Sequence, residues 1–348
     1  MSGFESIIDQ ERPIRILTTL LYHGTLPHAL LFTGIAGVGK KAAAIELARA
    51  CNCVKRNSGG RPKLKKNREN RGNRSNDLNL SVGPCGSCKS CRKIRAGNHP
   101  DIIQVKPTGP YIKIAQVRAL CNTLTMKPYE AKTRVVIMYD AQTMNPAAGN
   151  ALLKILEEPP QRTILILIAA QTQDLLPTIV SRCQQIRFNP ISKKTLEQLL
   201  VEEHGIEPQA ARSIATMANG SLSQATTMYK ANWINRRNWI LQEIIKLSLR
   251  STSHILAFAE RLSKDKETVL ESLEVMKTWL RDLVMATYAP GKILNQDIAE
   301  VIQKTAQNKS TASMLSKIDL VQKTQNSIQA NTNVRLALEI MLMKMAAL

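Results

Sequence analysis

The chain has 348 residues, of which 44% are hydrophobic and only 4% aromatic, so it can bury a large, mainly aliphatic core in two or three domains. Its formal charge of +21 favours a polyanionic partner, with nucleic acid ahead of a membrane surface. No apolar run reaches membrane-spanning length and residues 1–12 hold no signal segment, so we expect a cytoplasmic protein with no membrane partner.

Residues 1–191 alternate between helical and strand-like patterns. Helical periodicity runs over 5–23, an apolar run at 28–32 predicts a buried strand, and an Ala-rich helix is predicted at 42–51. Further strands are predicted at 101–105, 134–140 and 163–170, and further helices at 115–125 and 146–158. This alternation predicts an α/β domain with a parallel, doubly wound sheet.

From Ser192 onward the pattern is helical almost throughout. The clearest breaks are Asn219-Gly220 and Ala289-Pro290-Gly291. We therefore predict a small helical domain at 192–245 and a second helical domain at 246–348.

A glycine-rich loop stands between the first predicted strand and the Ala-rich helix, which is the context of a phosphate-binding loop. Its glycines are Gly34, Gly37 and Gly39. In such a loop, glycine N–H groups turn toward phosphate oxygens and a lysine, here Lys40, neutralises their charge. The following Ser or Thr normally binds magnesium, but here it is Lys41, whose ammonium group can only donate. The loop therefore predicts an ATP or ADP site that lacks a magnesium ligand.

A magnesium-coordinating acid is expected at the end of the predicted strand 134–140, and Asp140 stands there. Hydrolysis also needs a group that orients the attacking water, but the next residues, Ala141 and Gln142, offer no carboxylate. Asp140 can equally cap the following turn. These residues predict lost hydrolysis and leave open whether nucleotide still binds.

Four of the seven cysteines, Cys53, Cys85, Cys88 and Cys91, flank one segment of the chain. In a cytosolic chain, clustered cysteines indicate metal ligands rather than disulfides. Tetrahedral zinc takes four thiolate or imidazole ligands, usually in close pairs. The alternative, reduced surface thiols, leaves the regular spacing unexplained. We therefore predict a structural Zn²⁺ site.

The segment between Cys53 and Cys85, residues 54–80, contains nine Lys or Arg and two acids. Its net charge is a third of the net charge of the whole chain. It has few large apolar residues, so the composition predicts a disordered basic insertion. The insertion is either a tolerated surface loop or, together with the cysteines, part of a DNA-binding module.

Five stretches outside the insertion carry a family resemblance. They are His28-Ala29, the cysteine triplet with His99-Pro100-Asp101, the run 150–160 (NALLKILEEPP), the run 177–183 (PTIVSRC) and the run 333–339 (NVRLALE). Together they resemble the delta-prime subunits of bacterial DNA polymerase III clamp loaders, which are AAA+ proteins. The resemblance spans nearly the whole chain except the insertion.

The resemblance implies a AAA+ nucleotide-binding-like domain at 1–191, with a zinc module at 53–95, a helical lid at 192–245 and a helical collar at 246–348. The collar closes a hetero-pentameric ring with the motor and delta subunits of the loader. The implied further partners are the sliding clamp and primed DNA. The implied role is a stator, not catalytic alone, within the DNA polymerase III holoenzyme.

Arg182, in the Ser-Arg-Cys stretch, is implied to be an arginine finger that reaches ATP on a neighbouring motor subunit. A guanidinium group can stabilise the charge that develops on a transferring phosphoryl group. Without the resemblance, an ion pair with a local acid is the simpler interpretation of Arg182.

Two further positions depart from the motor subunits of the family. Ala169-Ala170 stands where a motor has a polar sensor, and Gly220-Ser221-Leu222-Ser223 lacks the sensing arginine of the lid. Together with Lys41 and Ala141, these positions make four departures from the motor subunits, and all four predict that the chain has lost ATP hydrolysis. The alternative functions are an active ATP-hydrolysing motor subunit and a zinc-dependent DNA-binding module.

The family also supplies a fourth zinc ligand after the first helix, and Cys53 matches that place, with Cys51 as a substitute. The 31 residues between Cys53 and Cys85 do not forbid the site, since loop-closure entropy rises slowly with length. Cys121 and Cys183 are interpreted as structural cysteines.

Overall fold

The structure, a computed structural model, describes residues 3–55, 83–230, 232–247, 252–307 and 309–347. The predicted basic insertion lies outside the described residues except for Val54 and Lys55. The chain divides into two compact units: Met1–Ser192 with Ser221–Ser223, and Lys193–Gly220 with Gln224–Leu348.

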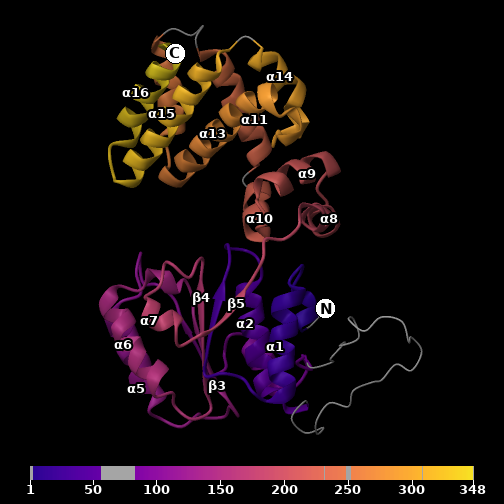
Figure 1. Ribbon diagram of the computed structural model, residues 1–348, viewed down its shortest axis with the longest axis vertical. Helices are drawn as coiled ribbons and strands as arrows, with labels where there is room; N and C mark the ends of the chain where they lie inside the picture. Colours follow the sequence, from indigo (N-terminus) through magenta and orange to yellow (C-terminus); the bar gives the residue numbers. More distant parts are fainter. Residues whose placement is uncertain (1–2, 56–82, 231, 248–251, 308, 348) are drawn as a thin grey trace, which may run out of the picture. The chain divides into compact units, whose positions relative to one another are not determined.

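A five-stranded sheet in the order β2-β3-β4-β1-β5 forms the centre of the first unit (Figure 1). All four strand pairings are parallel. The strands are β1 (Ala29–Thr33), β2 (Ile102–Val105), β3 (Arg134–Met138), β4 (Thr163–Ala169) and β5 (Gln184–Arg187). The predicted α/β fold class, with a parallel sheet followed by helices, is confirmed.

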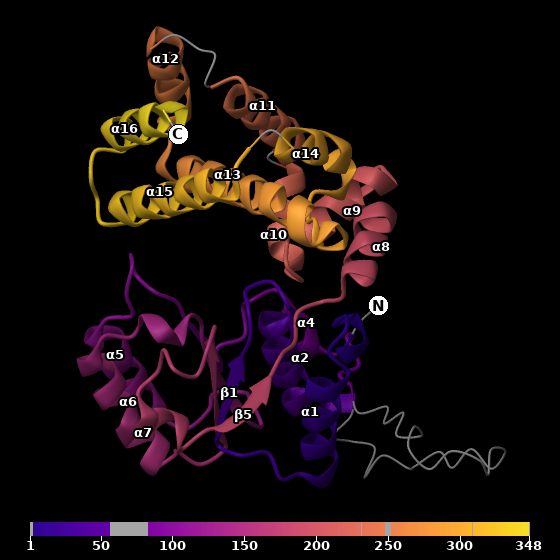
Figure 2. The same ribbon diagram turned by 45° about the horizontal axis from the view of Figure 1, so that its top comes forward.

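Helices cover both faces of this sheet in both views (Figures 1 and 2). Helices α1 (Glu11–His23) and α2 (Lys40–Asn52) lie on one face, and α5 (Ile114–Leu124) and α6 (Pro146–Glu157) lie on the other. Successive strand side chains point to opposite faces. In β1, Leu30 and Phe32 accordingly pack with the α1–α2 layer, whereas Leu31 packs with the α5–α6 layer.

Several boundaries in the first unit differ from the predicted ones. The helix predicted at 5–23 is a 3-10 turn, η1 (Phe4–Ser6), followed by α1, which has Pro13 in its first turn and ends at the left-handed Gly24. Helices α4 (Lys89–Arg95) and α7 (Pro177–Val180) and strand β5 were not predicted. In β5 only Ile186 is buried, so the strand lacks a continuous apolar run.

Beyond Ser192 the described chain contains no strand and is helical, as predicted. The helices are α8 (Lys193–His204), α9 (Pro208–Met217), α10 (Leu222–Lys230), α11 (Trp233–Ile245), α12 (Thr252–Leu262), α13 (Lys266–Tyr288), α14 (Ala299–Ala306), α15 (Thr311–Gln329) and α16 (Val334–Ala347). One apolar cluster that includes Trp279, Leu283 and Met341 forms the core of the second unit. Of the described helices, none has the length and apolar character that a bilayer crossing requires.

Candidate functional site

The loop Gly34–Lys41 joins β1 to α2, so it lies at the carboxyl end of a central strand. Gly34, Gly37 and Gly39 have φ of 138°, 79° and 96°, a region that glycine adopts most readily. A Cβ added at Gly34 would lie 2.5 Å from the carbonyl oxygen of Phe188. The glycines are therefore required by the backbone, which has the form of a phosphate-binding loop.

Lys40 is the first residue of α2, and its side chain is buried. Its ammonium group donates to the carbonyl oxygens of Gly34 and Ile35, the second at 3.0 Å. Burial lowers the pKa of Lys40, and the nearby carboxylate of Asp140 opposes that shift. The charge of Lys40 is thus held by the carbonyl oxygens of the loop itself.

Lys41, at the position of the missing magnesium ligand, is an exposed residue. Its Nζ lies 4.6 Å from the ring centroid of Tyr139, which is buried directly after β3. This is a cation–π contact. Lys41 therefore contacts an aromatic ring and offers no ligand to a metal ion.

Asp140 follows Tyr139 and is exposed, with φ of 49°. Its backbone carbonyl accepts a hydrogen bond from the Thr143 N–H at 2.8 Å, but its carboxylate makes no capping bond to the turn η2 (Ala141–Thr143). The carboxylate is instead the acid that opposes the lowering of the Lys40 pKa by burial. Ala141 is fully buried and brings no polar group to the loop.

Two other predicted departures lie at the loop. The Gly34 N–H donates to the Ala170 carbonyl at 3.0 Å, so the chain directly after β4 contacts the loop through its backbone. The Leu222 N–H donates to the Gly37 carbonyl at 3.2 Å, within the segment 221–223 that clusters with the first unit. Neither segment carries a charged side chain.

Arg182 follows α7, on a turn that leads into β5. Its Nη2 lies 2.8 Å from an Oε1 of Glu157, and its Nη1 donates to the Thr178 carbonyl at 3.0 Å. The side chains of Arg182 and Glu157 are 37% and 52% exposed. Arg182 therefore has the local acid that the simpler interpretation expects, yet it stays open to solvent.

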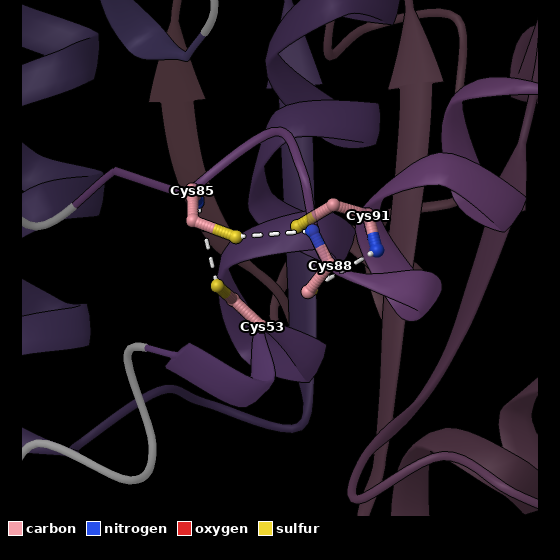
Figure 3. Close-up of side chains that lie close together, drawn as sticks. All are labelled: Cys53, Cys85, Cys88 and Cys91. Carbon is pink, nitrogen blue, oxygen red and sulfur yellow. Dashed lines mark hydrogen bonds between the residues drawn. The ribbon is translucent and has the colours of Figure 1, made fainter.

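The four predicted zinc ligands, Cys53, Cys85, Cys88 and Cys91, converge (Figure 3). All four sulfurs lie within 4.8 Å of one another, and sulfurs around tetrahedral zinc are separated by about 3.8 Å. The N–H groups of Cys88 and Cys91 donate to the sulfurs of Cys85 and Cys88, each at 3.4 Å. The cluster offers a metal ion four ligands at suitable spacing.

The thiols of the cluster differ in acidity. Burial opposes ionisation of Cys85, but hydrogen bonds from the backbone of Cys88 and Ser87 lower its pKa to about 6. Burial and the Cys88 side chain raise the pKa of Cys91 to about 12. Four thiolates this close repel one another, and a cation among them removes that cost.

The remaining cysteines lie outside the cluster. Cys51 is buried in α2 and packs in the apolar core beside the sheet, so Cys53 and not Cys51 joins the cluster. Burial raises the pKa of Cys183 to about 11, which makes it a poor nucleophile. Cys121 packs against the apolar core between the sheet and α5–α6.

Asp101, in the His-Pro-Asp stretch, anchors the loop after α5. Its carboxylate accepts hydrogen bonds from the N–H groups of Tyr129, Glu130 and Ala131, each at 2.8 Å. Glu130 in turn bonds Lys93 of α4 at 2.6 Å. Helix α4, which contains Cys91 and has Cys88 as its N-cap, is thereby tied to the sheet domain.

Sequence reasoning missed two partners of the predicted residues. Tyr139 stands directly before Asp140, and its place at the end of a buried strand was the available signal. Glu157 is the last residue of α6, and only the fold brings it close to Arg182.

Two family models match this chain. The model described as DNA polymerase III, delta subunit, matches residues 9–192. The model described as DNA polymerase III, delta subunit, C terminal, matches residues 231–346.

Individual relatives agree with the models. DNA polymerase III subunit delta' of Bacillus subtilis is 28% identical over 94% of this chain and 93% of its own. The subunit of the same name in Pseudomonas aeruginosa is 30% identical over 92% of both chains. DNA polymerase III subunit tau of Escherichia coli is 27% identical over 65% of this chain and 32% of its own. The chain therefore belongs to the DNA polymerase III delta-subunit family.

Proposed function

We propose that this chain is a non-hydrolysing stator subunit of a DNA polymerase III clamp loader, which helps to load the sliding clamp on primed DNA and acts in the cytoplasm. The observation that carries the proposal is the contrast between Lys41 and Arg182. The chain's own loop has a lysine in place of a magnesium ligand, whereas Arg182 is exposed beside a solvent-accessible partner.

In this role Arg182 leaves Glu157 and contacts ATP bound to a neighbouring motor subunit. An exposed ion pair is worth about 0–1 kcal/mol, so exchanging Glu157 for phosphate costs little. A guanidinium at the transferring phosphoryl group stabilises its developing charge.

Substitution of Arg182 tests this role. In the reconstituted loader, Arg182→Ala should slow hydrolysis at the adjoining ATP site by about a thousandfold, with assembly intact. The matched control is Glu157→Gln, which removes only the local partner and should leave hydrolysis unchanged. Single-turnover ATPase and size-exclusion chromatography give the two readouts. Normal hydrolysis in the Arg182 variant would contradict the finger role.

The helical region supports assembly into a ring. We propose that it forms a lid at 192–245 and a collar at 246–348 that joins motor and delta subunits in a hetero-pentamer. Helix α16 exposes Leu336, Ile340 and Met343, which are spaced four and three residues apart and so share one face. Such a stripe is suited to packing against another helix.

We also propose that the metal of the cysteine cluster is structural Zn²⁺. Four thiolates leave no open coordination position, so the site is expected to hold α4 and the end of α2 together and not to catalyse a reaction. Elemental analysis should find one zinc per chain, and chelation should lower the unfolding temperature.

An active motor subunit is the second candidate, since Lys40 and the loop glycines are present. A turnover assay of the full chain with Mg²⁺, ATP and primed DNA separates the two. Turnover that Lys40→Ala abolishes would support the motor and would contradict the stator role. A zinc-dependent DNA-binding module predicts instead that deleting residues 54–80 abolishes DNA binding.

A further inference from the structure

The fold of the first unit implies a magnesium–nucleotide complex at the loop Gly34–Lys41, but the residues at the loop differ from those that bind magnesium. In phosphate-binding loops Mg²⁺ takes the hydroxyl that follows the loop lysine and a carboxylate from a neighbouring strand. Here the place of the hydroxyl holds Lys41, whose Nζ lies 4.6 Å from the ring centroid of Tyr139, the residue directly before Asp140. An ammonium group has no lone pair to give, so this pair does not fit magnesium.

The Lys41–Tyr139 contact places a positive charge beside the loop. The ring of Tyr139 is buried, and its hydroxyl donates to Oε1 of Gln104 at 3.2 Å, which holds the ring in place. A second ammonium group, that of Lys106, lies 5.7 Å from the same ring. The aromatic face attracts both cations.

The rest of the loop keeps the form that phosphate binding needs. The glycines keep the positive φ of such a loop, and Lys40 supplies one positive charge. A nucleotide phosphate normally also needs the charge of a metal ion. Lys41 is the group on this chain that stands where that charge is required.

We propose that the Lys41 ammonium, held over Tyr139, replaces the metal ion, so that the loop binds the phosphates of an adenine nucleotide without a divalent cation. Binding must draw Lys40 away from the Gly34 and Ile35 carbonyl oxygens, which weakens the affinity but involves no metal. This goes beyond the stator role, which concerns ATP on a neighbour and needs no ligand in this loop.

The direct test titrates ADP into the full chain by calorimetry, once with Mg²⁺ and once with EDTA. We expect binding in both conditions, with dissociation constants that agree within about twofold, since no metal–phosphate bond is made. Binding that requires Mg²⁺ would overturn the proposal, and so would the absence of binding in EDTA. Neither result touches the Arg182 experiment, so the two proposals fail separately.

Substitutions then identify the residue responsible. Lys41→Thr should weaken ADP binding in EDTA by about tenfold, the effect of one charged hydrogen bond. Adding Tyr139→Asp to that variant should make binding depend on Mg²⁺. Lys106→Ala removes a charge near the same ring but outside the loop, and should change the dissociation constant by less than about twofold. Thermal unfolding verifies that each variant is folded.

An unchanged dissociation constant for Lys41→Thr in EDTA would overturn the assignment of the charge to Lys41. If the double variant does not fold, the paired titrations of the unaltered chain still decide whether the site is independent of metal.

Discussion

Helix α2 carries a different kind of site at each end. At its start the phosphate loop keeps its backbone but has lost a metal ligand, whereas Cys53 at its end joins a complete set of four ligands. A metal ion at the loop would take part only in a reaction, whereas a metal ion in the cluster would hold parts of the fold together. Backbone form and metal chemistry can therefore be lost independently, and the cluster should contribute far more to stability than the loop.

The largest expected effect is at the cluster. Cys53→Ser should abolish zinc binding and lower the free energy of unfolding by several kcal/mol, since metal binding adds directly to folding free energy. Cys51→Ser is the matched control, because Cys51 is also buried but packs in the apolar core. Elemental analysis and urea denaturation measure the two quantities.

The Cys51 variant should retain zinc while losing some packing stability. Zinc loss in that variant, with retention in Cys53→Ser, would reverse the ligand assignment and would remove the contrast between the two ends of α2.

A second effect concerns the anchor beside the cluster. Asp101→Asn should cost about 3 kcal/mol, because the carboxylate accepts three backbone N–H bonds and lies 3.6 Å from Nη2 of buried Arg134. Asp174→Asn, at an exposed position, is the control and should leave stability unchanged. Urea denaturation at neutral pH measures both.

The same anchor predicts a dependence on pH. Burial opposes ionisation of Asp101, but the N–H groups of Glu130, Tyr129 and Ala131 lower its pKa below the usual value. Its contribution is therefore present above about pH 4 and is lost as the pH falls through the lowered pKa. Asp101→Asn should lose less stability on acidification than the unaltered chain, and equal losses would show that Asp101 is not the group responsible.

The smallest effect is expected at the loop. Lys41→Ala removes one exposed cation–π contact and should change the free energy of unfolding by only about 0.5 kcal/mol. Denaturation of the variant beside Lys113→Ala, an exposed lysine, measures it. A loss as large as that of Cys53→Ser would mean that the loop also supports the fold.

The sequence predicted features that depend on local pattern. Apolar runs located β1, β2, β3 and β4, and glycine spacing located the loop between β1 and α2, because both patterns depend on residues that are close in the sequence. Strand β5 was missed because only Ile186 is buried in it.

Contacts between distant segments were beyond reach. Tyr139 meets Lys41 only because β3 and the loop end at the same edge of the sheet, and Glu157 meets Arg182 through the packing of α6 on α7. The cysteine spacing could suggest a metal but left Cys51 and Cys53 open. The turn of α2 at its end decides between them, since it directs Cys51 into the core.

The cluster also fixes the two ends of the chain segment that separates its ligands. The Cys85 N–H donates to the Cys53 sulfur at 3.3 Å, so the two cysteines lie side by side although 31 residues separate them in the sequence. The free-energy cost of closing a loop rises slowly with its length. We therefore expect that a fluorescent protein or an affinity tag inserted between these two cysteines would leave the cluster intact.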